Sequence, residues 1–158
     1  MSGNWEQWVP QAVRQLSFDD ALQINGPFKA LVISDLHMPF HDEKALVAAL
    51  EFGRKEKVDL VLLNGDGVDH FALSDYAKDP RLKDFPGEIR DAKRFLQGLR
   101  KVFGKKVRII YKHGNHEDRY ERYLQFKCPE LIGVPAFDWA EVFGLEEQGI
   151  ELVRQKRV

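Results

Sequence analysis

The stretch Lys29-Ala-Leu-Val-Ile-Ser-Asp-Leu-His37 passes from an apolar run directly into two polar side chains, Asp35 and His37. The same change occurs twice more: Asp59–Asn64 leads into Gly65-Asp66-Gly-Val-Asp69, and Val107–Lys112 leads into Gly114-Asn115-His116-Glu117. Each apolar run has the length and composition of a buried strand. The sequence therefore predicts three strands, each followed at its carboxyl end by side chains that bind metals or exchange protons.

Amphipathic helices are predicted between these strands, because apolar residues recur there at intervals of three and four. The predicted helices are Glu43–Lys57, Glu88–Phe103, about Glu117–Lys127 and a short helix after Asp138, with a fourth strand at Ile150–Val153. Continuous apolar strands that alternate with helices indicate an α/β fold, a parallel sheet with helices on both faces. Right-handed crossovers would bring the three polar segments to one edge of that sheet.

Length and composition are those of a globular domain. The chain has 158 residues, of which 44% are hydrophobic and 31% charged, and this is enough for one domain with a real core. The formal net charge of −1 gives no overall attraction to nucleic acid or membranes. A basic excess lies in Lys101–Lys127; we interpret it mainly as solvated charge, with phosphate attraction as the alternative.

Several other classes of protein are disfavoured. The single cysteine, Cys128, excludes an internal disulfide and a cysteine-based zinc cluster. No run approaches the ~20 apolar residues of a membrane span, and the first residues lack the features of a signal peptide. The sequence therefore predicts a cytoplasmic location. We expect residues 1–27 to form an N-terminal arm and residues 28–158 to form the domain.

The polar residues at the strand ends suit a metal centre. Asp35 and His37 lie two residues apart, so in an extended chain they point to the same side and suit a first-row divalent ion. The two carboxylate oxygens of Asp66 allow it to bridge two ions. Asn115 offers an amide oxygen, and His116 is a candidate ligand or general acid. Singly, each residue is also explained by turns or helix caps, but as a set they favour metal binding.

In their order and spacing, these segments resemble the first three motifs of the calcineurin-like metallophosphoesterases, and the segment 37–42 is similar to the phage and bacterial branch. The resemblance implies a four-layer αββα sandwich and two divalent metal ions, with Mn²⁺ favoured and Fe, Ni or Zn as alternatives. It also implies roles for individual residues: Asp35 and His37 on one ion, Asp66 bridging, Asn115 on the second ion, His116 as the catalytic group, Asp69 as its partner, and His70 as a substrate contact.

The chain departs from that family pattern after His116, because no later histidine is present. The expectation is therefore the N-terminal half of such a domain, without its C-terminal sheet. Hydrolysis of phosphomonoesters or phosphodiesters is the first hypothesis, and a non-catalytic metal-binding, phosphate-binding or structural subunit is the alternative. Expected partners are a phosphoester substrate, nucleic acid or nucleotide included, and either a second copy or a complementing C-terminal half. The segment 70–86 is predicted to form a lid.

Overall fold

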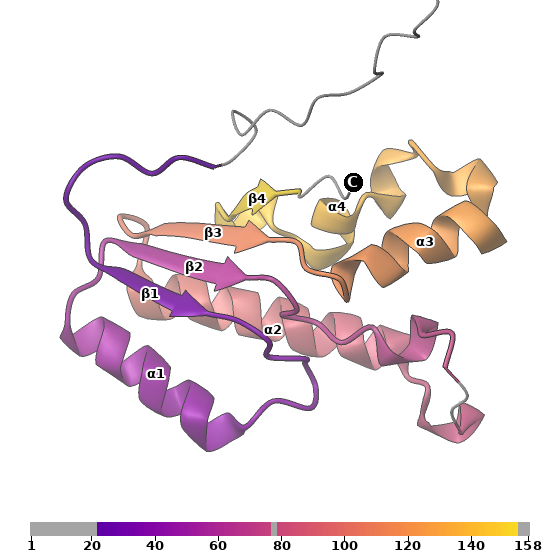
Figure 1. The fold of residues 1–158 in the computed structure, drawn as a ribbon, viewed down its shortest axis with the longest axis horizontal. Coiled ribbons are helices and arrows are strands. Elements are labelled where there is room, and N and C mark those ends of the chain that lie inside the picture. Colours follow the sequence, from indigo (N-terminus) through magenta and orange to yellow (C-terminus); the bar gives the residue numbers. More distant parts are fainter. Residues whose placement is uncertain (1–21, 77–78, 155–158) are drawn as a thin grey trace, which may run out of the picture.

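A single parallel sheet organises the part of the chain that the computed structural model describes, residues 22–76 and 79–154. Its strands follow the order β1-β2-β3-β4 (Figure 1). Their bounds are Ala30–Ile33 for β1, Leu60–Asn64 for β2, Arg108–Lys112 for β3 and Glu151–Val153 for β4. The predicted parallel α/β sheet is confirmed. Most of the proposed arm, residues 1–27, lies outside the described residues.

The register of the sheet aligns the strand ends that carry the polar segments. Ile33 of β1 pairs with Leu63 of β2, and Leu63 pairs with Tyr111 of β3. All three strands run in the same direction, so the segments that follow them leave the sheet at the same edge. This alignment brings residues from three distant parts of the sequence into one region.

Four α-helices connect and follow the strands: α1 (Glu43–Lys55), α2 (Phe85–Phe103), α3 (Glu117–Lys127) and α4 (Trp139–Phe143). The carboxylate of Asp42 accepts the Ala45 N–H at 3.0 Å and caps α1, as the sequence suggests. The helix α2 begins three residues before its predicted start, because Asp84 caps it by accepting the Gly87 N–H at 2.9 Å. None of the helices in the described part has the length and apolarity that crossing a membrane requires.

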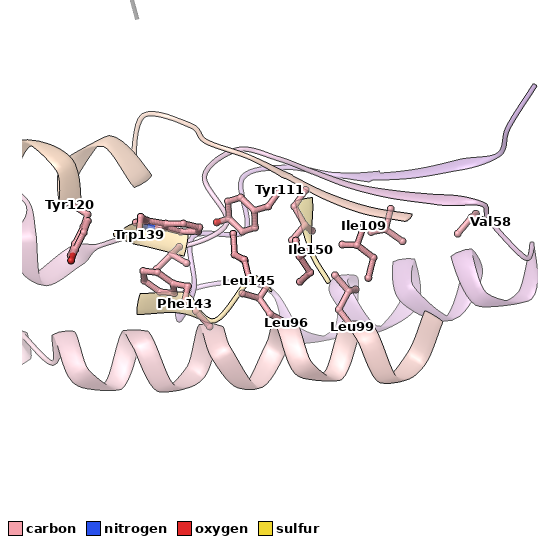
Figure 2. Close-up of a cluster of buried hydrophobic side chains, with 14 of the residues drawn as sticks. Val58, Leu96, Leu99, Ile109, Tyr111, Tyr120, Trp139, Phe143, Leu145 and Ile150 are labelled. Carbon is pink, nitrogen blue, oxygen red and sulfur yellow. The ribbon is translucent and has the colours of Figure 1, made fainter. Parts of the chain in front are cut away.

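The hydrophobic core lies on one face of the sheet, between the strands and the helices (Figure 2). Ile109 and Tyr111 project from β3 toward Leu96 and Leu99 of α2, and Trp139 of α4 packs on the Tyr111 ring with the centroids 4.9 Å apart. The connecting helices α1 and α2 lie on the same face of the sheet (Figure 1).

The opposite face of the sheet is also apolar. Leu60, Leu62 and Ile110 alternate with the core-facing residues and so point away from α2, and Leu60 and Ile110 are buried on that side. Val32 of β1 shares that face and is 56% exposed. The connection order explains the arrangement: each right-handed crossover moves one strand farther in the same direction, which places all the connecting helices on one side.

Candidate metal and phosphate site

Backbone strain is concentrated in the first two loops at the carboxyl edge of the sheet. Only five non-glycine residues of the described ranges have positive φ, and Asp35, His37, Asp66 and His70 are four of them, with φ between 50° and 57°. Residues other than glycine adopt the left-handed region uncommonly, and Asp and His are among those that do so most often. Strain of this kind persists where the surrounding structure holds it, and it gathers at functional sites.

Backbone hydrogen bonds extend the pairing of β1 and β2 into these loops. The Asp35 N–H donates to the Gly65 carbonyl at 3.1 Å, and the His37 N–H donates to the Asp66 carbonyl at 2.9 Å. Farther along, the Asp69 N–H donates to the Met38 carbonyl at 2.9 Å. These bonds hold both loops in one arrangement, which accounts for the persistence of the strained φ angles.

The buried carboxylate of Glu117 fastens the second loop to the third. It is fully buried and accepts the backbone N–H groups of Asp66 (3.0 Å), Gly67 (2.9 Å), Val68 (3.2 Å) and Gly114 (2.8 Å). The Tyr111 hydroxyl donates to it at 2.6 Å. Burial is the main cause that raises the pKa of Tyr111 well above its usual value, and the negative charge of Glu117 is the second. The phenol therefore keeps its proton and remains a hydrogen-bond donor. One side chain thus determines the position of Asp66.

At Gly67 and Gly114, neighbouring atoms lie so close to the backbone that no side chain fits. A side chain at Gly67 would collide with the Tyr111 hydroxyl, and one at Gly114 would collide with the carboxylate and backbone nitrogen of Asp66. The absence of Cβ at Gly114 lets the third loop approach the second until the His116 N–H donates to the Asp66 carboxylate at 2.8 Å. Asp66 is therefore bound through its backbone and its side chain.

Three candidate metal-binding side chains converge next to this contact. One ligand atom from each of His37, Asp66 and His116 lies within 4.8 Å of the other two. The two imidazole rings meet edge to face, with their Nδ1 atoms 3.3 Å apart. Imidazole nitrogen and carboxylate oxygen together suit first-row divalent ions. This donor set fits a metal of the class that the sequence indicates.

Asp69 lies beside both histidines, as its place in the second motif suggests. Its carboxylate is 3.5 Å from Nδ1 of His37 and 3.4 Å from Nδ1 of His116. Its backbone carbonyl is 2.9 Å from Nδ1 of His116. A carboxylate in this place orients the two imidazole rings.

Arg119 contacts the same cluster from the first turns of α3. Its Nη1 donates to the Asp69 carbonyl at 2.9 Å and to the Asp69 carboxylate at 3.2 Å. Its Nη2 lies 3.0 Å from Nε2 of His116. Because a guanidinium only donates, Nε2 of His116 is the acceptor in this arrangement. The guanidinium places a fixed positive charge directly beside the histidine.

The remaining predicted ligands lie on two hollows that flank the cluster. Asp35 is 67% exposed, approaches Nε2 of His37 to 4.0 Å and lines one hollow together with His37. Asn115 is exposed and lines the other hollow together with Asp66. The structure therefore divides the four residues into two pairs, with the carboxylate of Asp66 near both the second hollow and the histidine cluster.

His70 does not lie at the site surface. Its side chain is fully buried among aromatic rings, and the Trp139 indole N–H donates to its Nε2 at 3.3 Å. Removal from water is the main cause that lowers the pKa of His70 to about 3, and the charges of His113, Arg119 and His116 act in the same direction. The expected substrate contact is not met, because a ring buried in this way cannot reach a phosphate.

The buried imidazole predicts a pH-dependent stability. Since the folded-state pKa of His70 lies below the unfolded value of 6.5, only the unfolded chain takes up its proton between those values. The stabilising contribution is complete above pH 6.5 and falls by about 1.4 kcal/mol for each pH unit below it. Urea unfolding of the wild type and of His70→Phe from pH 7 to pH 4 measures this slope. The variant should lose less stability on acidification, and equal slopes would contradict the prediction.

Two of the residues that build the site were not assigned to it from the sequence. From the sequence, Glu117 is predicted to be the first residue of a helix, and Arg119 is predicted to be one of the solvated charges of the basic segment. Their positions carried a signal: Glu117 directly follows Asn115-His116, and Arg119 lies one helical turn after His116. The contacts with Asp66 and Asp69, about fifty residues earlier, depend on the tertiary fold.

Comparison with known proteins identifies one matching protein family and similar proteins from two phages. The sequence model of the calcineurin-like phosphoesterases matches residues 28–156. The "Gene 54 protein" of Mycobacterium phage L5 is 28% identical over 131 residues, which cover 79% of this chain and 50% of that protein. The "Gene 54 protein" of Mycobacterium phage D29 is 32% identical over 124 residues, 75% of this chain and 45% of that protein. The chain spans about half the length of these curated relatives.

Proposed function

Because the chain belongs to the calcineurin-like phosphoesterase family, we propose that it contributes the catalytic carboxyl edge of a metal-dependent hydrolase of phosphomonoesters or phosphodiesters. The observation that carries the proposal is the convergence of His37, Asp66 and His116 within 4.8 Å, in loops whose backbone is strained and fastened by Glu117.

The proposed metal ligands fall into two sets that share Asp66. Asp35 and His37 would hold one divalent ion, Asn115 would hold the second, and Asp66 would contribute to both. The two flanking hollows and the central position of Asp66 support this assignment. The family generally binds divalent metals, and Mn²⁺ is our first candidate, followed by Fe, Ni or Zn. Bound cations of this kind polarise a phosphoryl oxygen and lower the pKa of water, so that hydrolysis proceeds near neutral pH.

The chain's own residues handle the proton of the leaving group. In hydrolysis the oxygen of water bonds to phosphorus, the ester P–O bond breaks, and the departing oxygen needs a proton. In the free protein Nε2 of His116 accepts a hydrogen bond from Arg119, so it takes up a proton from the solvent when the substrate displaces Arg119. His116 then passes this proton from Nε2 to the departing oxygen, while Asp69 anchors its Nδ1 through the contacts of 2.9 Å and 3.4 Å. The guanidinium then offers its charge to the phosphate oxygens.

Turnover by the purified chain tests this proposal. With Mn²⁺ present, the wild type is expected to hydrolyse bis-p-nitrophenyl phosphate or p-nitrophenyl phosphate, and Asp66→Asn is expected to lower the rate by at least about a hundredfold. Asp91→Asn, an exposed change on α2, is the matched control and should leave the rate unchanged. If the wild type releases no nitrophenolate at any Mn²⁺ concentration, this chain alone is not the enzyme.

A binding role without catalysis is the second candidate. The observation that favours it is the small number of ligands, since the described residues provide one cluster of three convergent histidine and carboxylate groups. In that case Mn²⁺ binds without turnover, and the remaining ligands come from a complementing C-terminal half or a second copy. Val32, which is exposed on the edge strand β1, marks the part of the sheet on which such a half would pack. Adding the second half of a relative's sequence to this chain should then restore hydrolysis.

A further inference from the structure

One face of α3 carries basic and aromatic side chains away from the candidate site. Starting at His116, the residues Arg119, Tyr123 and Phe126 follow at intervals of three or four, so they lie above one another along the helix. Tyr123 is 40% exposed and Phe126 is 77% exposed. Ten residues of helix extend about 15 Å. The face therefore continues well beyond the space that one phosphate group needs.

The charges on this face are positive and available to a ligand. Arg122 and Lys127 are exposed, and neither forms an ion pair with a carboxylate in residues 22–76 and 79–154. Arg119 provides a third cation at the end nearest the site, where it is bound to Asp69 and close to His116. The chain as a whole has a net charge of −1, so this grouping is local.

A hollow separates this helix face from the segment that follows the second loop. Arg119, Arg122, Tyr123 and Phe126 line it from α3, and Leu73 and Asp75 line it from the end of η3 (Phe71–Leu73) and the residues after it. Asp75 is the carboxylate of this lining. Figure 1 shows α3 and the segment around η3 both extending beyond the carboxyl ends of the strands. The hollow is therefore contiguous with the site through Arg119.

We propose that this face binds a single-stranded nucleic acid and leads one of its phosphodiesters to His116. Exposed aromatic rings provide stacking surfaces for bases, and cations between them contact the phosphate backbone. In this arrangement Tyr123 and Phe126 stack with bases, while Arg122 and Lys127 contact phosphates. The bases must be unpaired, because rings reach only the faces of bases outside a duplex. The proposal rests on the proposed function and names its substrate class.

A small phosphomonoester or a free nucleotide explains the observations less well. Its phosphate would be held at the strand ends, and it would not reach rings two or three helical turns from His116. An apolar protein partner would leave Arg122 and Lys127 desolvated without a counter-charge, which is unfavourable. A polyanion with flat aromatic bases satisfies both features of the face together.

Fluorescence anisotropy of a labelled oligothymidylate, measured with EDTA and no added metal, tests binding separately from catalysis. The wild type is expected to bind the strand, and Tyr123→Ala combined with Phe126→Ala should weaken binding about tenfold or more. Arg122→Gln should lower the slope of log affinity against log salt by about 0.7. Phe52→Ala combined with Lys55→Gln removes an exposed aromatic and a cation from α1. This matched control should bind as the wild type does.

Four results separate this proposal from the phosphoesterase proposal. Equal binding by the wild type and the Tyr123/Phe126 double variant overturns it, and so does equal affinity for the strand and for its duplex. Hydrolysis of bis-p-nitrophenyl phosphate is measured on the same proteins with Mn²⁺. A double variant that keeps this hydrolysis but loses cleavage of the oligonucleotide supports the proposal. A wild type that binds the strand yet hydrolyses neither substrate overturns the proposed function and still supports the strand-binding face.

Discussion

Replacing Glu117 with alanine is expected to lower the free energy of unfolding by about 4 kcal/mol and to abolish metal binding. The substitution leaves the backbone N–H groups of Asp66, Gly67, Val68 and Gly114, and the Tyr111 hydroxyl, without their shared acceptor. Buried donors without partners cost about 1–3 kcal/mol each, and partial relaxation recovers some of that cost. The second loop would also lose the contacts that hold Asp66 in its strained conformation.

Urea unfolding and Mn²⁺ titration of Glu117→Ala measure the two effects. Glu121→Ala is the matched control, because it removes the same side chain from the same helix where the carboxylate forms an exposed pair with Arg154. Exposed pairs contribute about 0–1 kcal/mol, so the control should remain close to the wild type. A Glu117→Ala protein as stable as Glu121→Ala would show that the loops hold their positions without this carboxylate.

Replacing His116 with alanine is expected to lower the rate of phosphoester hydrolysis by about 10²–10⁴-fold, the range typical of a lost general acid or base. The affinity for Mn²⁺ should change much less, because the proposed ligands Asp35, His37, Asp66 and Asn115 remain. This comparison separates the two roles that the sequence allows for His116. A large fall in Mn²⁺ affinity would identify the imidazole as a ligand.

Comparing the rate loss of His116→Ala on substrates with different leaving groups tests whether His116 donates a proton. A general acid matters most when the departing oxygen is strongly basic. The loss caused by His116→Ala should therefore be larger with phenyl phosphate than with p-nitrophenyl phosphate, whose nitrophenolate leaves without much help. An equal loss with both substrates would contradict proton donation by Nε2, even if the overall rate falls as expected.

The strands and most helix bounds could be predicted from local patterns. The apolar run after Lys29 forms β1. Asp42 and Asp138 are the N-cap residues of α1 and α4, as the sequence suggests. The start of α2 was missed by three residues, because the Asp84 cap and the proline in the first turn outweigh the apolar period that begins later. Patterns of this kind depend on neighbouring residues, so they can be recognised in the sequence without knowledge of the tertiary structure.

The placement of His70 could not be predicted, because it depends on tertiary contacts. His70 follows the second motif directly, so its sequence position indicated a substrate contact. Its burial arises from Trp139, sixty-nine residues later. Glu117 and Arg119 were missed for the same reason.

Mn²⁺ binding by Asp66→Asn is the decisive measurement for the proposed metal site, because Asp66 is the residue that would join the three loops in it. Asparagine has the same shape and can still accept the His116 N–H that binds the Asp66 carboxylate, so the fold should persist. Isothermal titration of Mn²⁺ is predicted to show binding by the wild type and at least a tenfold weaker affinity for the variant. Equal affinity and stoichiometry in the two proteins would contradict the account.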